Sequence, residues 1–149
     1  MKSTLVPGMS HELRFTIPRS KTVPALYPES PDFRTMPEVF ATGFMVGLME
    51  WACIEALTPH LDEGEGSLGV GIAVTHTAPT LPGQTVIVTV TCRAVDGRRV
   101  GWDVVARDEL DIIGGGTHDR AVVAWDRFSA RLDERRERLA ATGTPVPPA

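Results

Sequence analysis

The sequence predicts an α+β domain in which one antiparallel sheet curls around a single long apolar helix. The helix is expected at residues 36–61, which are apolar nearly throughout and carry a proline near each end. Five stretches have the residue pattern of strands: 11–17, 67–77, 85–95, 100–107 and 112–125. Short turns join the last four stretches, so we expect a meander that follows the helix in sequence.

This order, with one strand before the helix and four after it, is the hotdog arrangement. Small residues such as Gly43 and Gly47 stand between large apolar ones along the helix. A curled sheet of this kind leaves one strand edge and one helix face open. We therefore expect a homodimer that covers both.

Composition excludes several classes of protein. The chain has 149 residues, 42% of them hydrophobic, and a net charge of −4, which argues against nucleic acid as the main partner. Glu50 interrupts the best candidate for a membrane span, and the N-terminus lacks the apolar core of a signal peptide. Cys53 and Cys92 are expected to be free thiols in the cytoplasm. No cysteine and histidine spacing predicts a metal site.

The chain divides into three parts. Residues 1–10 are expected to be a flexible leader, 11–128 the domain, and 129–149 a charged, proline-rich tail. A short charged helix is expected at 127–141, across the end of the domain and the start of the tail. Residues 18–37 hold five prolines and several apolar side chains. Such a loop is either a lid over a site or a plain connector that packs on the core.

One carboxylate, Glu50, lies between Met49 and Trp51 in the middle of the apolar helix. An ionised carboxylate in apolar surroundings is costly unless it is paired with another group or has a functional role. Thr42, eight residues earlier, is either a helix cap or a functional hydroxyl. His76, at the end of a predicted strand, is either structural or catalytic.

Together, Thr42, Glu50 and His76 have the chemistry of a nucleophile and base set for acyl transfer. Within one regular helix, Thr42 and Glu50 lie about 12 Å apart along the axis and about 80° apart around it. Either Thr42 belongs to an irregular first turn, or the groups converge from two chains, or substrate bridges them. His118 and Arg120 share one face of the last strand and could equally be solvated surface residues.

Five stretches carry a resemblance to a known family. They are KTVPALYPESPDF (21–33), PEVFATGFMVGLMEWAC (37–53), GEGSLG (64–69), VTHTA (74–78) and GTHDRAV (116–122). Over roughly residues 11 to 128 the chain resembles the hotdog-fold thioesterases that hydrolyse fluoroacetyl-CoA in fluoroacetate-producing bacteria. The resemblance implies a homodimer that protects the cell from fluoroacetate.

The resemblance also implies roles for single residues. The catalytic threonine, glutamate and histidine of the family fall on Thr42, Glu50 and His76. A glycine whose backbone helps to bind the thioester carbonyl falls on Gly69, and an arginine associated with the active site falls on Arg120.

The lid of the family matches Val23, Leu26 and Phe33, but its second lid aromatic is Met36 here. This departure bears on how the lid controls water and recognises the fluorinated acyl group. The resemblance implies hydrolysis of a short acyl-CoA thioester, with fluoroacetyl-CoA as the expected substrate, without metal or organic cofactor; CoA is part of the substrate. A general short-chain acyl-CoA thioesterase and a non-catalytic acyl-CoA-binding hotdog module are the alternatives.

Overall fold

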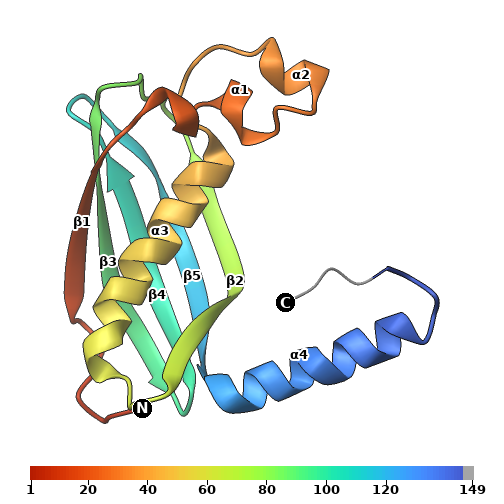
Figure 1. Cartoon of the computed structure of the whole chain (residues 1–149). Coiled ribbons are helices and arrows are strands. Elements are labelled where there is room, and N and C mark those ends of the chain that lie inside the picture. Colours follow the sequence, from red (N-terminus) through yellow and green to blue (C-terminus); the bar gives the residue numbers. More distant parts are fainter. Residues whose placement is uncertain (146–149) are drawn as a thin grey trace.

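The computed structural model describes residues 1–145 and contains five strands and one long central helix (Figure 1). The strands are β1 (Ser10–Thr16), β2 (Glu65–His76), β3 (Thr85–Asp96), β4 (Arg99–Arg107) and β5 (Ile112–Ala124). The longer helices are α3 (Thr42–Leu57) and α4 (Trp125–Ala140). Short helical turns are η1 (Arg19–Lys21), α1 (Val23–Leu26), α2 (Pro31–Arg34) and η2 (Thr58–His60).

All five strands form one antiparallel sheet in the order β1-β3-β4-β5-β2. Helix α3 lies across one face of this sheet, as Figure 1 shows, and buries Met45, Met49, Ala52 and Cys53 completely. The hotdog arrangement predicted from the sequence is confirmed. The strands form where apolar and polar residues alternate, because one face of the sheet covers the helix.

The predicted start of the central helix is wrong. Helix α3 begins at Thr42 and not at residue 36, because the backbone of residues 39–41 bonds to other segments. The Phe40 amide donates to the carbonyl of Thr80 at 2.8 Å, and the Ala41 amide donates to the carbonyl of Lys21 at 3.1 Å. Phe40 is only 2% exposed. Burial of this side chain and these bonds hold the segment extended up to the helix.

The proline-rich stretch, residues 18–37, contains the helical turns η1, α1 and α2, which cluster at the N-terminal end of α3 (Figure 1). The stretch is therefore not a plain loop but contains these three helical turns of three or four residues each. Leu26 of α1 packs on Gly43, where a Cβ atom would come within 3.2 Å of the leucine methyl groups. The rings of Tyr27 and Phe33 pack with their centroids 5.8 Å apart.

The ladder between β2 and β5 is irregular. Its register shifts between Gly69 and Gly71, which is a β-bulge. Further along, a side chain at Gly114 would overlap the carbonyl of Thr75, and one at Gly116 would overlap the carbonyl of Ala73. Glycine at these two positions therefore allows the backbones of β2 and β5 to approach closely.

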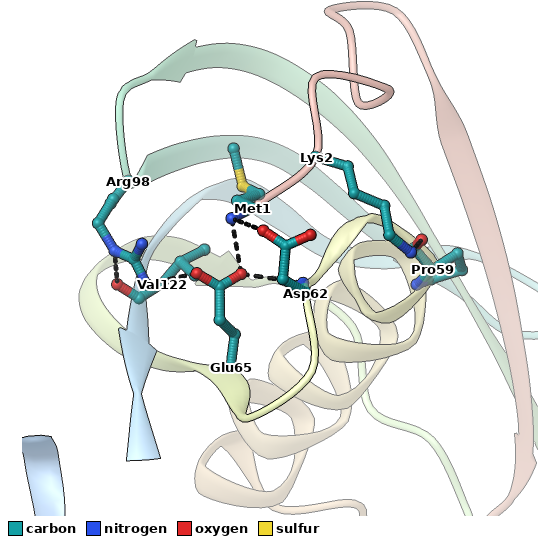
Figure 2. Close-up of polar contacts among 7 residues, drawn as sticks. All are labelled: Met1, Lys2, Pro59, Asp62, Glu65, Arg98 and Val122. Carbon is teal, nitrogen blue, oxygen red and sulfur yellow. Dashed lines mark hydrogen bonds and ion pairs between the residues drawn. The ribbon is translucent and has the colours of Figure 1, made fainter. Parts of the chain in front are cut away.

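Residues 1–10, expected to be a flexible leader, pack against the domain. Leu5 is 5% exposed and belongs to the core. The amino group of Met1 lies 2.7 Å from a carboxylate oxygen of Asp62 and 2.7 Å from one of Glu65, as Figure 2 shows. Apolar burial and two ion pairs thus hold this segment against the end of α3 and the start of β2.

Glu65 links this segment to the sheet, and its pKa predicts how stability depends on pH. The hydrogen bond from the Met1 amino group, with further bonds from the Asp62 amide and Arg98, lowers the pKa of Glu65 to about 2 from 4.5. A lowered carboxyl pKa stabilises the fold above pH 4.5, and this stabilisation is lost as the pH falls toward 2.

We expect Glu65→Gln to make the loss of stability between pH 4.5 and 2 shallower. Urea unfolding at a series of pH values measures the effect, with Glu63→Gln, an exposed neighbour, as the matched control. Equal pH dependence in the Glu65 variant and the unchanged protein would contradict the assignment.

Helix α4 leaves the end of β5 and projects away from the sheet (Figure 1). Trp125 at its start packs on Gly66 of β2, a position where a Cβ atom would overlap the indole ring. Helix α4 starts two residues before the charged helix expected at 127–141. Residues 146–149 of the expected tail lie outside the described residues. Among residues 1–145, no helix combines the length and the apolar character needed to cross a membrane.

Candidate active site

Thr42 and His76 form a hydrogen-bonded pair at the start of α3. Thr42 is the first residue of the helix, and Ala41 occupies the cap position without a side-chain bond. The Thr42 hydroxyl lies 2.9 Å from Nδ1 of His76, which is the last residue of β2. The interpretation of Thr42 as a helix cap is therefore wrong, because its side chain binds the histidine.

The other ring nitrogen of His76, Nε2, has different surroundings. Nε2 is buried and has no hydrogen-bond partner among the described residues. Burial lowers the pKa of His76, an effect that the backbone at Ala78 opposes, so the neutral imidazole is favoured. The ring borders an open pocket of about 310 Å³, whose lining is Val23, Val39, Phe40, Thr42, His76, Thr77, Ala78 and Pro79.

Glu50 belongs to a second cluster, about two turns further along α3. Its side chain is 40% exposed, and its carboxylate packs directly on the backbone of Gly69 in β2. A side chain at position 69 would overlap Oε1 of Glu50. Glycine is therefore required here, because it lets the carboxylate approach the β2 backbone.

Arg120 and His118 extend from β5 toward this carboxylate and are 3% and 2% exposed. The suggestion that they are solvated surface residues is wrong. Arg120 Nη1 lies 3.7 Å from Glu50 Oε1, while its Nε and Nη2 donate to the hydroxyl and carbonyl of Ser67, each at 2.9 Å. The guanidinium is thus fixed beside the Glu50 carboxylate.

Burial and charge oppose each other at this cluster. Burial lowers the pKa of the Arg120 guanidinium, and the Glu50 carboxylate works against that change. Cys53, one turn after Glu50, is completely buried, and burial raises the pKa of its thiol to about 12. The Cys53 thiol therefore stays protonated and is a poor nucleophile.

A single chain does not bring the three predicted catalytic residues together. Thr42 lies in a regular helix, so the alternative of an irregular first turn is wrong. The helical rise separates it from Glu50 by about 12 Å along the axis. Thr42 contacts His76, and Glu50 contacts Arg120, so two half-sites remain on one chain.

The predicted lid residues take different places. Val23 lines the pocket beside His76, whereas Leu26, Phe33 and Met36 are absent from that lining. Met36 is 49% exposed.

The sequence analysis did not identify Ser67, which anchors Arg120. The only signal for Ser67 in the sequence is its place within the GEGSLG stretch. Within residues 1–145, no three His, Cys, Asp or Glu side chains are grouped as metal ligands.

A solved structure of similar fold indicates the class of protein to which this chain belongs. The chain is 28% identical to a Thermus thermophilus hypothetical protein of the thioesterase superfamily, covering 93% of this chain and 98% of that one, with a TM-score of 0.84. The fold is therefore that of a hotdog-fold thioesterase.

More specific matches identify the family. Residues 26–126 match the family model described as "Fluoroacetyl-CoA-specific thioesterase". A fluoroacetyl-CoA thioesterase of Streptantibioticus cattleyicolor is 55% identical over 135 residues, which are 91% of this chain and 97% of that protein. A structure of the fluoroacetyl-CoA thioesterase FlK is 55% identical, covers 89% of this chain and 98% of its own, and has a TM-score of 0.87. The chain belongs to the fluoroacetyl-CoA-specific thioesterase family.

Proposed function

We propose that this protein hydrolyses fluoroacetyl-CoA to fluoroacetate and CoA and thereby removes a toxic thioester. The observation that carries the proposal is the Thr42–His76 pair, whose histidine borders an open pocket. Membership of the family supports the substrate. The reaction needs only water and the thioester, so we propose no metal or organic cofactor; CoA enters as part of the substrate. Free Cys53 and Cys92 support a cytoplasmic location.

Glu50 is the proposed centre of the chemistry. In one form of the reaction it takes a proton from water as the water oxygen bonds to the thioester carbon and the C–S bond breaks. In the other form its own oxygen attacks that carbon, CoA leaves, and water then cleaves the resulting anhydride. Both forms need an ionised carboxylate, and the Arg120 guanidinium lies beside it, with Nη1 3.7 Å from Glu50 Oε1.

His76 and Thr42 act on the other side of the thioester. His76 transfers a proton through its free Nε2, either to the departing CoA sulfur or from the Cα of the acyl group, which fluorine makes more acidic. The Thr42 hydroxyl orients the imidazole ring through Nδ1. The Gly69 backbone amide is the proposed donor to the thioester carbonyl oxygen, which gains negative charge as the bond is attacked.

A homodimer would unite the two half-sites. One edge of β2 pairs with β5, and the other edge has no strand partner within residues 1–145. Val70 and Ile72 on this strand are 49% and 45% exposed. An antiparallel pairing of two β2 strands centred near Ile72 brings His76 of one protomer opposite Gly69 of the other. Directly opposed residues share a face of the sheet, so Glu50 and His76 from different chains would meet.

The dimer is testable in solution. We expect light scattering at micromolar concentration to give twice the 16.1 kDa mass of one chain, because the open strand edge and its apolar side chains need a cover. The mass of a single chain would contradict both the dimer and the shared site.

Release of CoA thiol from fluoroacetyl-CoA and acetyl-CoA, measured side by side, tests the function. We expect rapid release from fluoroacetyl-CoA and slow release from acetyl-CoA. Comparable release from both would favour the second candidate, a general short-chain acyl-CoA thioesterase, which the unusual Met36 favours. No release from either would leave a binding module that retains acyl-CoA without hydrolysing it.

The lid offers a prediction about selectivity, on the proposal that residues 18–37 cover the acyl group. Methionine is flexible and fills gaps without fixing their shape, and Met36 is half exposed in the single chain. An aromatic ring there has fewer rotamers. We expect Met36→Phe to increase the preference for fluoroacetyl-CoA over acetyl-CoA by about fivefold, on the order of 1 kcal/mol.

The measurement is kcat/KM for both thioesters in both proteins. Tyr27→Phe, which keeps the ring in the same loop, is the matched control. An unchanged or narrower ratio in the Met36 variant would show that selectivity resides in the catalytic residues.

A further inference from the structure

We propose that His118 is a positioning residue that ties the Arg120–Glu50 pair to the β2 bulge beside Gly69. The inference rests on the proposed function, since it concerns how that active site is held. His118 does not belong to the lining of the pocket beside His76, and its hydrogen bonds go to Gly71 and Arg120. Its effect on the reaction would pass through Arg120, and its bond to the backbone of β2 holds the imidazole ring in place for that contact.

The hydrogen bonds of His118 define its protonation state. Nδ1 lies 2.7 Å from the carbonyl oxygen of Gly71, which can only accept, so Nδ1 carries the proton. Nε2 lies 3.1 Å from Nη1 of Arg120, which can only donate, so Nε2 carries a lone pair. His118 is therefore the neutral Nδ1–H tautomer, and its 3.7 Å approach to Glu50 is not an ion pair.

Through Nε2, His118 completes the anchoring of Arg120. Ser67 already holds two of the guanidinium nitrogens, Nε and Nη2. The bond from Nη1 to His118 fixes the third, and because the guanidinium is planar, three fixed nitrogens determine its position. Nη1 is also the nitrogen that lies 3.7 Å from Glu50. The placement of positive charge beside the carboxylate thus depends on His118.

Through Nδ1, His118 holds the irregular part of β2. Gly71 is the residue at which the ladder with β5 resumes after the bulge, and its carbonyl is the acceptor. Gly69, at the other side of the bulge, presents its backbone to Glu50, and a Cβ there would also come within 3.1 Å of the His118 ring. One side chain therefore bonds to Gly71 and to the arginine and lies beside Gly69.

Three substitutions separate positioning from general stability. His118→Leu removes both hydrogen bonds, whereas His118→Gln keeps one donor and one acceptor. Asp119→Asn is the matched control, because Asp119 is the next residue on β5 but pairs with Arg93 at 3.0 Å, away from the active-site cluster. Steady-state hydrolysis of fluoroacetyl-CoA and thermal unfolding are measured for all three.

We expect His118→Leu to lower kcat on the order of 10- to 100-fold with little change in KM, because small displacements of catalytic groups have effects of this size. His118→Gln should recover most of the loss, and Asp119→Asn should match the unchanged protein. If the Leu protein does not fold, His118→Asn replaces it, since Asn is long enough for Gly71 but too short for Arg120. It should lose activity as the Leu variant would.

A double substitution tests the route of the effect. If His118 acts through Arg120, His118→Leu should cause little further loss in a protein that already carries Arg120→Met. If the two substitutions lower kcat independently, so that their effects multiply, the inference about His118 is wrong. The same holds if the His118 variants are as active as the unchanged protein. In both cases the proposed function still stands. An unchanged protein that releases no thiol from fluoroacetyl-CoA would overturn the proposed function and this inference together.

Discussion

Glu50→Gln is expected to lower kcat/KM for fluoroacetyl-CoA by about 10²–10⁴-fold, the usual range for loss of a general base. Gln has the shape of Glu and preserves the packing on Gly69. It can neither take a proton from water nor form an acyl intermediate. The charge interaction with Arg120 is lost as well, but Glu50 is 40% exposed, so the fold should tolerate the change.

The measurement is steady-state thiol release, with circular dichroism and thermal unfolding to confirm the fold. Glu55→Gln is the matched control, because Glu55 is on the same helix but binds His11 at 2.8 Å and not the site cluster. If the Glu50 variant is as fast as the unchanged protein, the proposed role of Glu50 is wrong.

Two inactive variants are expected to restore activity when they share one dimer. His76→Ala and Glu50→Gln should each be nearly inactive as homodimers. In a heterodimer of the two, one shared site would combine the intact His76 of one chain with the intact Glu50 of the other. The second site would carry both substitutions. We therefore expect about half the activity of the unchanged dimer, since a two-fold dimer has two equivalent sites.

Co-expression with two different affinity tags, followed by sequential purification, isolates the heterodimer for the thiol-release assay. The matching control is a doubly tagged homodimer of Glu50→Gln, which should stay inactive. A heterodimer no more active than its parents would contradict a site built from two chains. It would favour a substrate that bridges the half-sites within one chain.

The sequence predicts the strands well because their signals are local. Alternation in β3 and β4 and the turn at Gly97 and Arg98 between them depend on neighbouring residues only. The helix start depends on distant partners: the extended segment before Thr42 is held by Lys21 and Thr80, which no local pattern reveals. The ordered first residues depend likewise on distant carboxylates.

The candidate site is predictable only in part. Glu50 stands out because a carboxylate in an apolar helix needs a reason. The period of two shows that His118 and Arg120 share a face but cannot tell which face of the sheet is covered. Their burial follows from α3 lying over that face. The pairing of Thr42 with His76 joins segments far apart in the chain, so geometry alone reveals it.

The bulge in β2 also changes the phase of the strand. Gly69 and His76 are seven residues apart, so a strand with a strict period of two would turn them to opposite faces. Yet both face α3, where one meets Glu50 and the other Thr42. The extra residue, Val70, is what reverses the alternation. Deletion of Val70 would remove none of the proposed catalytic residues. It would nevertheless turn either the Gly69 side or the His76 side of β2 away from α3, so that one half-site would face the outside of the sheet.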